Sequence, residues 1–353
     1  MNLDEWRSRI NNLDNQILTL LNQRAEAALE IGDLKRQVGA PVYVPEREIQ
    51  IVRRLCEANA GPLTDDMVRA IWREILSGCR AVEAPVTIAF LAPFGTFTHQ
   101  AALGRFGESA VYRPARSMPE IFDDVERGQA AYGVVPVENS TEGAVNVTLD
   151  RLVDADVVIC GEAYLEVAQN LLSRATELGE IKRVLSHPQG LAQCRRWLVE
   201  HLRDVPTEET TSTAAAAEIA AGDATVAAIA SELAGRLYGV PTLRARIEDN
   251  RNNATRFLVI GRRPVTPTGR DKTSILFAMP NTAGALHSIL EPFARRGLNL
   301  TKIESRPARQ RAFDYVMFVD FEGHRDTPAV ESALADVRDR TLYLKVLGSY
   351  PAA

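Results

Sequence analysis

The chain has 353 residues, which is more than one hydrophobic core comfortably serves, so two or three domains are expected. Its 46% hydrophobic and 25% charged residues are typical of a soluble globular protein, and the net charge of -5 argues against a nucleic-acid-binding protein. No apolar run approaches the roughly 18 residues that a membrane span requires.

The cysteines and the N-terminal segment favour a cytoplasmic protein. Cys56, Cys79, Cys160 and Cys194 lie far apart without metal-ligand spacing, which is typical of reduced thiols. The first residues, MNLDEWRSRI, contain acids and lack the apolar stretch of a signal peptide. The five histidines do not cluster. We therefore expect neither a metal nor a cofactor.

Residues 1–84 are expected to form an all-helical domain. Between residues 3 and 38 there is no proline, and apolar residues recur at helical spacing. A second helix is expected to begin at Pro45 and a third to cover residues 64–82. Three helices of which one is unusually long cannot bury its apolar stripe within one chain. Self-association is therefore expected.

Residues 86–262 alternate between short apolar segments and helical segments. The runs VTIAFLA, AAYGVVPV, DVVICGEAYLEV, RVLSHP and ATVAAIAS predict buried strands, and segments such as QGLAQCRRWLVEHL predict helices between them. This order predicts an α/β domain with a mostly parallel sheet and two lobes around a cleft. Ligands in such domains bind at strand carboxyl ends and helix N-termini.

After the linker GRRPVTPTGRDK, residues 271–353 follow the order of a ferredoxin-like βαββαβ domain. The expected fold class is therefore multidomain, with an all-α, a two-lobed α/β and a ferredoxin-like part.

Two cations in the long helix could hold a small dianion. Arg24 and Lys35 are 11 residues apart, so they differ by about 20° around the helix and by about 16 Å along it. Arg7 is about 25 Å from Arg24 along the same helix, so only an antiparallel partner could bring it to the same site. Spacing alone leaves open the alternative that these are surface charges beside a helical core.

The pattern R..I..LD..IL.LL..R...A.EIG..K, followed by PVYVPERE, resembles the all-helical chorismate mutases, which are intertwined dimers that rearrange chorismate to prephenate. The resemblance implies catalytic roles for Lys35 and Glu83. It also implies substrate contacts for Arg24, Arg47, Glu48 and Cys79 of one chain and for Arg7 of the partner chain. Such a pericyclic reaction needs only restraint of the substrate and cations near the developing charge.

Glu83 stands where some members of that family have glutamine, facing the substrate ether oxygen. An ionised carboxylate would repel this oxygen, so we expect burial to keep Glu83 protonated. Mutase activity is then expected to fall as the pH rises.

Three runs in the middle segment, APFGTFTHQAA, VPVENSTEGAVNVTLD and SHPQGLAQC, place small polar residues at strand-to-helix turns, and TRF follows near residue 255. Singly they could be helix caps. Together they resemble prephenate dehydratase. That resemblance implies catalytic roles for Thr255, Glu138, Asn139, Ser186 and Gln193. It implies substrate contacts for Thr96, Phe97, Thr98, Ser140, Arg256 and Phe257.

Prephenate must lose carbon dioxide and its ring hydroxyl together, and aromatisation drives the reaction. The resemblance implies that Thr255 gives a proton to the leaving hydroxyl and that Arg256 fixes a carboxylate. Glu138, if protonated, is the rival donor. His99 and His187 each lie beside a turn and are expected to be structural. Phe257 is expected to pack in the protein rather than to contact substrate.

The motifs NTAGALH and ESRP resemble the paired motifs of ACT domains, which sense amino acids. The resemblance implies that phenylalanine binds between two such domains, at Asn281, Gly284, Ala285, Leu286, Glu304, Ser305, Arg306 and Pro307. Without it, Gly284 would be a loop glycine and Glu304 and Arg306 a surface pair.

Together these patterns predict a bifunctional enzyme of phenylalanine biosynthesis that acts on chorismate and prephenate and forms a homodimer or larger assembly. No G-x-G-x-x-G follows a strand, which argues against a nicotinamide-dependent dehydrogenase. Two alternatives stay open: a non-catalytic amino-acid sensor, and an enzyme that retains one of the two activities.

Overall fold

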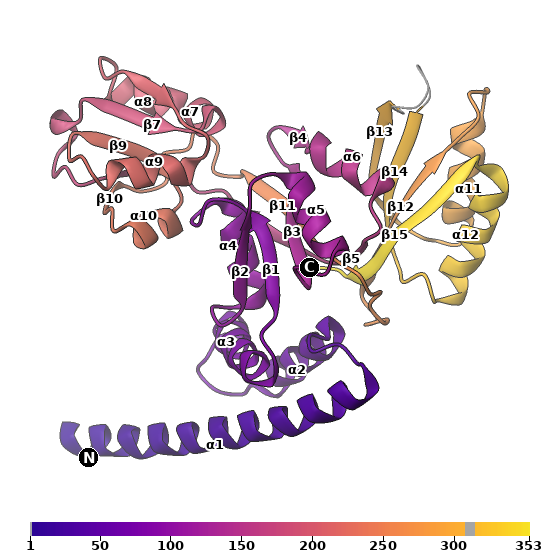
Figure 1. The fold of residues 1–353 in the computed structure, drawn as a ribbon, viewed down its shortest axis with the longest axis horizontal. Helices are drawn as coiled ribbons and strands as arrows, with labels where there is room; N and C mark the ends of the chain where they lie inside the picture. The colour runs from indigo at the N-terminus through magenta and orange to yellow at the C-terminus, as the bar shows by residue number, and fades with distance from the viewer. Residues whose placement is uncertain (1, 308–314) are drawn as a thin grey trace. The chain divides into compact units, whose positions relative to one another are not determined.

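The structure is a computed structural model that describes residues 2–307 and 315–353 (Figure 1). The chain divides into two compact units. The first runs to Ile88 and includes Leu103–Tyr112, and the second holds Ala89–Ala102 and Arg113–Ala353. In the described ranges, no helix is both long enough and apolar enough to cross a membrane.

The first unit contains the three expected helices: α1 (Leu3–Val38), α2 (Pro45–Ala58) and α3 (Asp65–Glu83). Asn2 and Glu5 form a reciprocal capping box at the start of α1, and Gly39 ends it in the left-handed conformation with φ 65°. Local cap residues therefore define both ends of this helix, which covers the proline-free range 3–38.

Almost the whole surface of α1 is exposed in one protomer. Gly32 is the only buried residue of the helix. Large apolar side chains that are 48% to 78% exposed recur at alternate spacings of three and four in two stretches of the helix. They are Leu3, Trp6, Ile10, Leu13, Ile17 and Leu20 in the first stretch, and Ile31, Leu34 and Val38 in the second. Arg24 continues this series between Leu20 and Ile31. The spacing is that of a helix–helix seam.

The first sheet, most of which belongs to the second unit, has the order β2-β1-β3-β11-β5. Its strands are β2 (Val111–Ala115), β1 (Thr87–Leu91), β3 (Tyr132–Asn139), β11 (Ala254–Gly261) and β5 (Val158–Glu166), with β4 (Gly143–Ala144) paired to β3. Its helices are α4 (Phe97–Phe106), α5 (Met118–Glu126) and α6 (Asn146–Asp154). The late strand β11 inserts between β3 and β5, antiparallel to both.

A second sheet has the order β10-β6-β9-β7-β8. Its strands are β10 (Thr242–Arg244), β6 (Asn170–Ser173), β9 (Val226–Ala230), β7 (Arg183–Ser186) and β8 (Thr207–Glu209). Its helices are η1 (Leu178–Glu180), α7 (Pro188–Gln193), α8 (Arg195–His201), α9 (Thr213–Ala220) and α10 (Glu232–Tyr238). The prediction of a mostly parallel sheet is wrong, because β6, β10 and β11 all pair antiparallel.

The segment QGLAQCRRWLVEHL forms two helices where the sequence predicts one. Asp249, distant in sequence, accepts hydrogen bonds from the backbone N–H groups of Arg196 (3.0 Å) and Trp197 (3.3 Å). A carboxylate there caps a new helix N-terminus, so α7 ends at Gln193 and α8 begins at Arg195.

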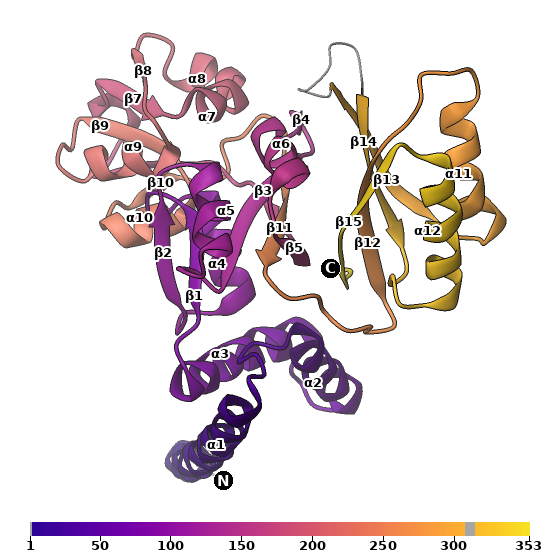
Figure 2. The same cartoon turned by 45° about the vertical axis from the view of Figure 1, so that its right-hand side comes forward.

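The C-terminal part has the predicted βαββαβ order, and its sheet runs β13-β14-β12-β15. The elements are β12 (Asp271–Ala278), α11 (Ala285–Arg295), β13 (Leu300–Pro307), β14 (Tyr315–Glu322), α12 (Pro328–Arg340) and β15 (Tyr343–Pro351). Figure 2 shows α11 and α12 over one face of this sheet. Side chains of the other face, such as Leu276 and Phe318, join a core with Phe122 of α5 and Leu258 of β11.

Candidate functional site

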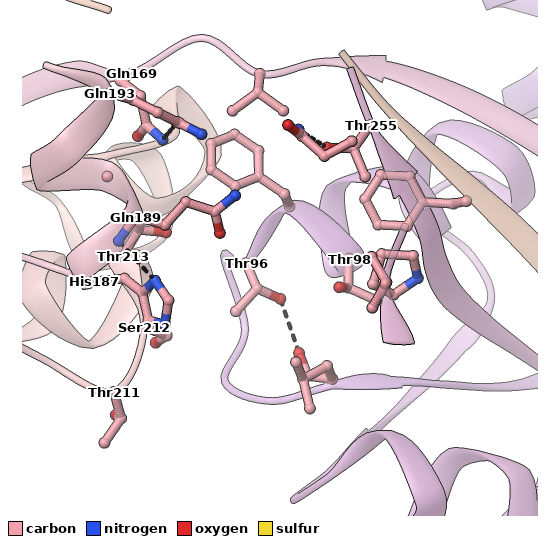
Figure 3. Close-up of a pocket in the computed structure, with 18 of the residues that line it drawn as sticks. Thr96, Thr98, Gln169, His187, Gln189, Gln193, Thr211, Ser212, Thr213 and Thr255 are labelled. Carbon is pink, nitrogen blue, oxygen red and sulfur yellow. Dashed lines mark hydrogen bonds between the residues drawn. The ribbon is translucent and has the colours of Figure 1, made fainter. Parts of the chain in front are cut away.

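A pocket of about 300 Å³ lies between the two mixed sheets of the second unit. Thr255, Thr96 and Thr98 face Gln169, Gln193 and His187 across it (Figure 3). The residues that line the pocket are Leu91, Thr96, Phe97, Thr98, Met118, Pro136, Asn139, Val145, Val167, Gln169, His187, Gln189, Gly190, Gln193, Thr211, Ser212, Thr213, Thr255 and Phe257. None of these lining residues carries an aspartate, glutamate, lysine or arginine side chain.

Asn139 and Thr255 form a buried pair on the pocket side of β3 and β11. They are opposite each other in the ladder, and the Asn139 Nδ2 donates to Thr255 Oγ1 at 2.8 Å. The Asn139 Oδ1 accepts from the backbone N–H groups of Thr141 (2.9 Å) and Glu142 (3.1 Å), which fixes the orientation of the amide. Because Thr255 Oγ1 accepts this bond, its own hydroxyl proton is available to a ligand in the pocket.

Arg256 and Glu138 lie on the opposite face of the same strands, since neighbouring strand residues point to opposite faces. Arg256 donates to Glu162 at 2.8 Å and to Asp320, and Lys302 donates to Glu138 at 2.8 Å. Neither Arg256 nor Glu138 lines the pocket. The expectation that Arg256 shares a site with Thr255, and that Glu138 lines the same cleft, does not match this arrangement.

The other expected residues of this segment divide into two groups. Thr96, Phe97, Thr98, Gln193 and Phe257 line the pocket, and Phe257 is also 1% exposed, consistent with packing. Ser186 does not line it, because its buried hydroxyl donates to the Ile229 carbonyl at 2.7 Å. Ser140 lies at the surface, where its hydroxyl donates to the Asn252 carbonyl and accepts from the Ala254 N–H.

Several lining residues are absent from the set expected from the sequence: Gln169, His187, Gln189, Gly190, Thr211, Ser212 and Thr213. Gln169 donates to Gln193 Oε1 at 3.0 Å, which links the segment between β5 and β6 to α7. Ser212 caps α9 by accepting from the Ala215 N–H at 3.0 Å. The run TTST before an alanine-rich helix is a cap signal that could have drawn attention to residues 211–213.

His99 is a structural residue beside the pocket, as expected. Its Nδ1 accepts from the Gly95 N–H at 3.1 Å and its ring stacks on Phe90 at 4.6 Å. Burial lowers the pKa of His99 to about 4. Its neutral form therefore predominates at neutral pH, where it is a poor general acid.

Acid should lower the free energy of unfolding because the buried His99 binds a proton less readily than an unfolded histidine. An unfolded histidine titrates near a pKa of about 6.5, so the unfolded chain binds a proton more readily as the pH falls from about 6.5 to about 4. Stability should then fall by up to about 1.4 kcal/mol per pH unit from this group. Urea unfolding of a His99→Asn variant should show a smaller pH slope in this window. The exposed His201→Asn is the control, and an unchanged slope in His99→Asn would contradict the assignment.

In the helical unit, Lys35 and Glu83 form an ion pair in which the glutamate is buried and the lysine is half-buried. Lys35 Nζ donates to Glu83 Oε1 at 2.9 Å and to the Val42 carbonyl at 2.8 Å, and Glu83 is 8% exposed. Glu83 is buried as expected, but it is paired with the cation of Lys35 in the same chain. Protonation of Glu83 in the presence of substrate stays a prediction.

The remaining expected residues of this unit do not form a closed site in one protomer. Arg47 is exposed, Arg24 is half-buried, and Arg7 is exposed and pairs with Asp4 at 3.4 Å. Glu48 accepts from Arg80, whose guanidinium lies over the ring of Tyr43 at 5.1 Å. Cys79 is buried in α3. No sequence pattern indicated a role for Arg80, which is buried and also donates to the Phe106 carbonyl.

The two expected ligand motifs of the C-terminal part lie on α11 and β13. Gly284 is the N-cap residue of α11 and has φ 80°, a conformation that L side chains rarely adopt. On β13, Glu304 and Arg306 lie on one face, while Ser305 and Pro307 are exposed on the other. Arg306 donates to Asp150 at 2.9 Å and to Asn146 of α6, so it is not an isolated surface charge. Asn281, Ala285 and Leu286 flank Gly284.

Three family models cover most of the chain: chorismate mutase type II matches residues 6–84, prephenate dehydratase residues 88–265, and the ACT domain residues 273–339. A bifunctional chorismate mutase/prephenate dehydratase of Aquifex aeolicus is 46% identical over 355 residues, covering 99% of this chain and 98% of that protein. One of Pseudomonas aeruginosa is 44% identical over 357 residues with the same coverage. The prephenate dehydratase of Arthrobacter aurescens, solved in complex with L-Phe, aligns with TM-score 0.70 and 36% identity over 76% of this chain and 90% of that one.

Proposed function

Because the chain belongs to the family of bifunctional chorismate mutase/prephenate dehydratases with an ACT domain, we propose roles for individual residues at its three sites. The mutase domain converts chorismate to prephenate, and the dehydratase domain converts prephenate to phenylpyruvate, in the aromatic amino acid pathway. The observation that carries the assignment of the dehydratase site is the Asn139–Thr255 pair facing the pocket.

Thr255 is the proton donor to the departing ring hydroxyl. The bond between the ring and its carboxylate breaks, its electrons enter the ring, and the hydroxyl leaves as water with the proton from Thr255. The Asn139 Nδ2–H, 2.8 Å from Thr255 Oγ1, stabilises the negative charge that develops there. Thr255 regains its proton from water after carbon dioxide has left. Glu138 is not the donor, because it pairs with Lys302 on the far side of β3.

The uncharged pocket suits a carboxylate that must leave as carbon dioxide. A guanidinium on that carboxylate would stabilise the ground state and oppose decarboxylation. Hydroxyls and amides hold prephenate instead, and its second carboxylate meets the N-terminal ends of α4 and α9, at Thr96–Thr98 and Thr211–Thr213. The placement of Arg256 outside the pocket supports this assignment.

The mutase site is completed by a second copy of the chain. The exposed apolar series on α1 needs a partner helix, and Arg24 lies in the same series. Arg24, Lys35 and Arg47 of one protomer and Arg7 of the other surround chorismate, with Glu48 at its hydroxyl and Glu83 at its ether oxygen. An antiparallel dimer brings Arg7 to the far end of the partner's α1.

Phenylalanine binds the ACT domain and inhibits the dehydratase. The ligand of the relative from Arthrobacter aurescens supports this choice. The exposed side of β13 and the turn at Gly284 would contact the amino acid, between two ACT domains. Inhibition requires that phenylalanine bind the active and inactive states unequally.

A time course on purified chain tests these assignments together. Chorismate is supplied without nicotinamide, with and without phenylalanine, and chorismate, prephenate and phenylpyruvate are followed. Phenylpyruvate should form through prephenate and be suppressed by phenylalanine. Accumulation of prephenate alone would overturn the dehydratase assignment, and no turnover would favour a sensor.

A Gly284→Ala variant, strained at φ 80°, should keep both rates and lose sensitivity to phenylalanine.

A further inference from the structure

The back of the two catalytic strands is covered by the C-terminal sheet. Leu258 of β11 and Val135 of β3 share one hydrophobic core with Leu276, Phe318 and other residues of that sheet. Arg256 and Glu138, opposite each other in the ladder, point to this side. Each therefore lies one residue from a pocket residue, Thr255 or Asn139, but contacts the regulatory domain.

Arg256 is held from three directions. Its Nε donates to Glu162 of β5 at 2.8 Å, its Nη1 to Asp320 of β14, and its Nη2 to the Tyr350 hydroxyl of β15 at 2.9 Å. The side chains of Arg256 and Glu162 are 7% and 0% exposed, and that of Asp320 is 11% exposed. Two of the three acceptors thus belong to the ACT domain.

The acceptors are themselves fixed by further bonds. Asp320 Oδ1 accepts from Ser274 Oγ at 2.6 Å, and Glu162 Oε1 accepts from Lys272 Nζ at 2.8 Å. Burial disfavours the charge of Arg256, but nearby Tyr350, Asp320 and Glu162 outweigh burial and raise the pKa of Arg256. The guanidinium is a permanent cation whose direction is determined by β5 and the ACT sheet.

We propose that Asp320 of the ACT domain, by holding Arg256, positions the Thr255 hydroxyl and the Asn139 amide for the dehydratase reaction. Thr255 and Arg256 are consecutive in β11, so the backbone that carries the hydroxyl moves with the guanidinium. Arg256 is a positioning residue and touches no substrate. The inference rests on the proposed role of Thr255, and it gives the regulatory domain a direct part in building the catalytic site.

A substrate contact and a positioning role for Arg256 predict different kinetics. If Arg256 bound a carboxylate of prephenate, Arg256→Gln would mainly raise KM and Asp320→Asn would change little. If Arg256 positions Thr255, both variants should lower kcat by about 10- to 100-fold and leave KM within about threefold, because misplacing a donor harms the reaction more than binding.

The variants are assayed with prephenate as full chains. The control is Glu322→Gln, which removes the same charge from an exposed position of the same strand. The double variant Asp320→Asn/Arg256→Gln should lose no more kcat than Arg256→Gln alone, because each change removes the same Arg256–Asp320 ion pair. Glu162 stays paired with Lys272 in all of these variants. Additive losses, or variants within twofold of the wild type, would overturn the proposal.

The variant Tyr350→Phe provides a second test of the proposal if the charge variants do not fold. It removes one acceptor from Arg256 without changing a charge, and a smaller loss in kcat at unchanged KM is expected. Hydrogen exchange adds a readout that needs no turnover. Amides of β11 and of β3 around Asn139 should exchange faster in Tyr350→Phe and Asp320→Asn, while those of β9 should not. Unchanged exchange in β11 would contradict the proposal even in a chain that lacked dehydratase activity.

Discussion

Thr255→Val should lower the dehydratase kcat by about 10²- to 10⁴-fold, the usual contribution of a positioned proton donor. Valine has nearly the shape of threonine, so the pocket wall is kept while the hydroxyl is lost. Thr255→Ser retains the hydroxyl and its bond from Asn139, and it should retain most of the activity. The measurement is the rate of phenylpyruvate formation from prephenate at saturating substrate.

The same preparations provide an internal control. Mutase activity, measured from chorismate, should be unchanged in both variants because Thr255 lies in the other unit. Asn139→Asp is a sharper test of the pair: its carboxylate would accept the Thr255 proton instead of donating to Oγ1, so activity should fall nearly as far as in Thr255→Val. If Thr255→Val keeps more than about a tenth of the activity, the hydroxyl is not the donor.

Mutase activity should return when two inactive variants share a dimer. Arg7→Ala and Arg24→Ala should each lose about 10²- to 10³-fold of the mutase rate, the usual loss for one electrostatic contact. In a mixed dimer, one site combines the intact Arg24 of one chain with the intact Arg7 of the other. Co-expression with two tags and tandem purification should therefore give about half of the wild-type rate, since one of two sites is complete.

A matched mixture distinguishes shared sites from other forms of rescue. Arg24 and Lys35 are proposed to serve the same site from one chain, so mixed dimers of Arg24→Ala and Lys35→Ala contain no complete site. That mixture should stay as inactive as its parents, while dehydratase activity is unaffected in all samples. Activity in the control mixture, or none in the first one, would refute the sharing of Arg7 across the dimer.

Much of this protein could be predicted from local sequence signals. The bounds of α1 follow from an uninterrupted helical repeat, a capping box at Asn2 and a left-handed Gly39. The βαββαβ order of the C-terminal part follows from alternating apolar runs and turn residues. The segments that line the pocket at Thr96–Thr98 and Thr255 could be identified because the motifs APFGTFTHQAA and TRF resemble those of prephenate dehydratase. These features depend on residues close together in the chain, where propensity and capping act.

The tertiary structure decided which side of each strand faces the pocket. Thr255 and Arg256 are adjacent in sequence, but strand alternation places the hydroxyl in the pocket and the guanidinium against Asp320, which is 64 residues away. The same rule separates Asn139 from Glu138. Gln169, His187 and residues 211–213 reach the pocket only because the second sheet packs opposite the first. Ser186 is withdrawn by the carbonyl of Ile229 on a neighbouring strand. Such contacts join distant segments, and their partners are set by packing and by the pairing of buried polar groups, which no local pattern encodes.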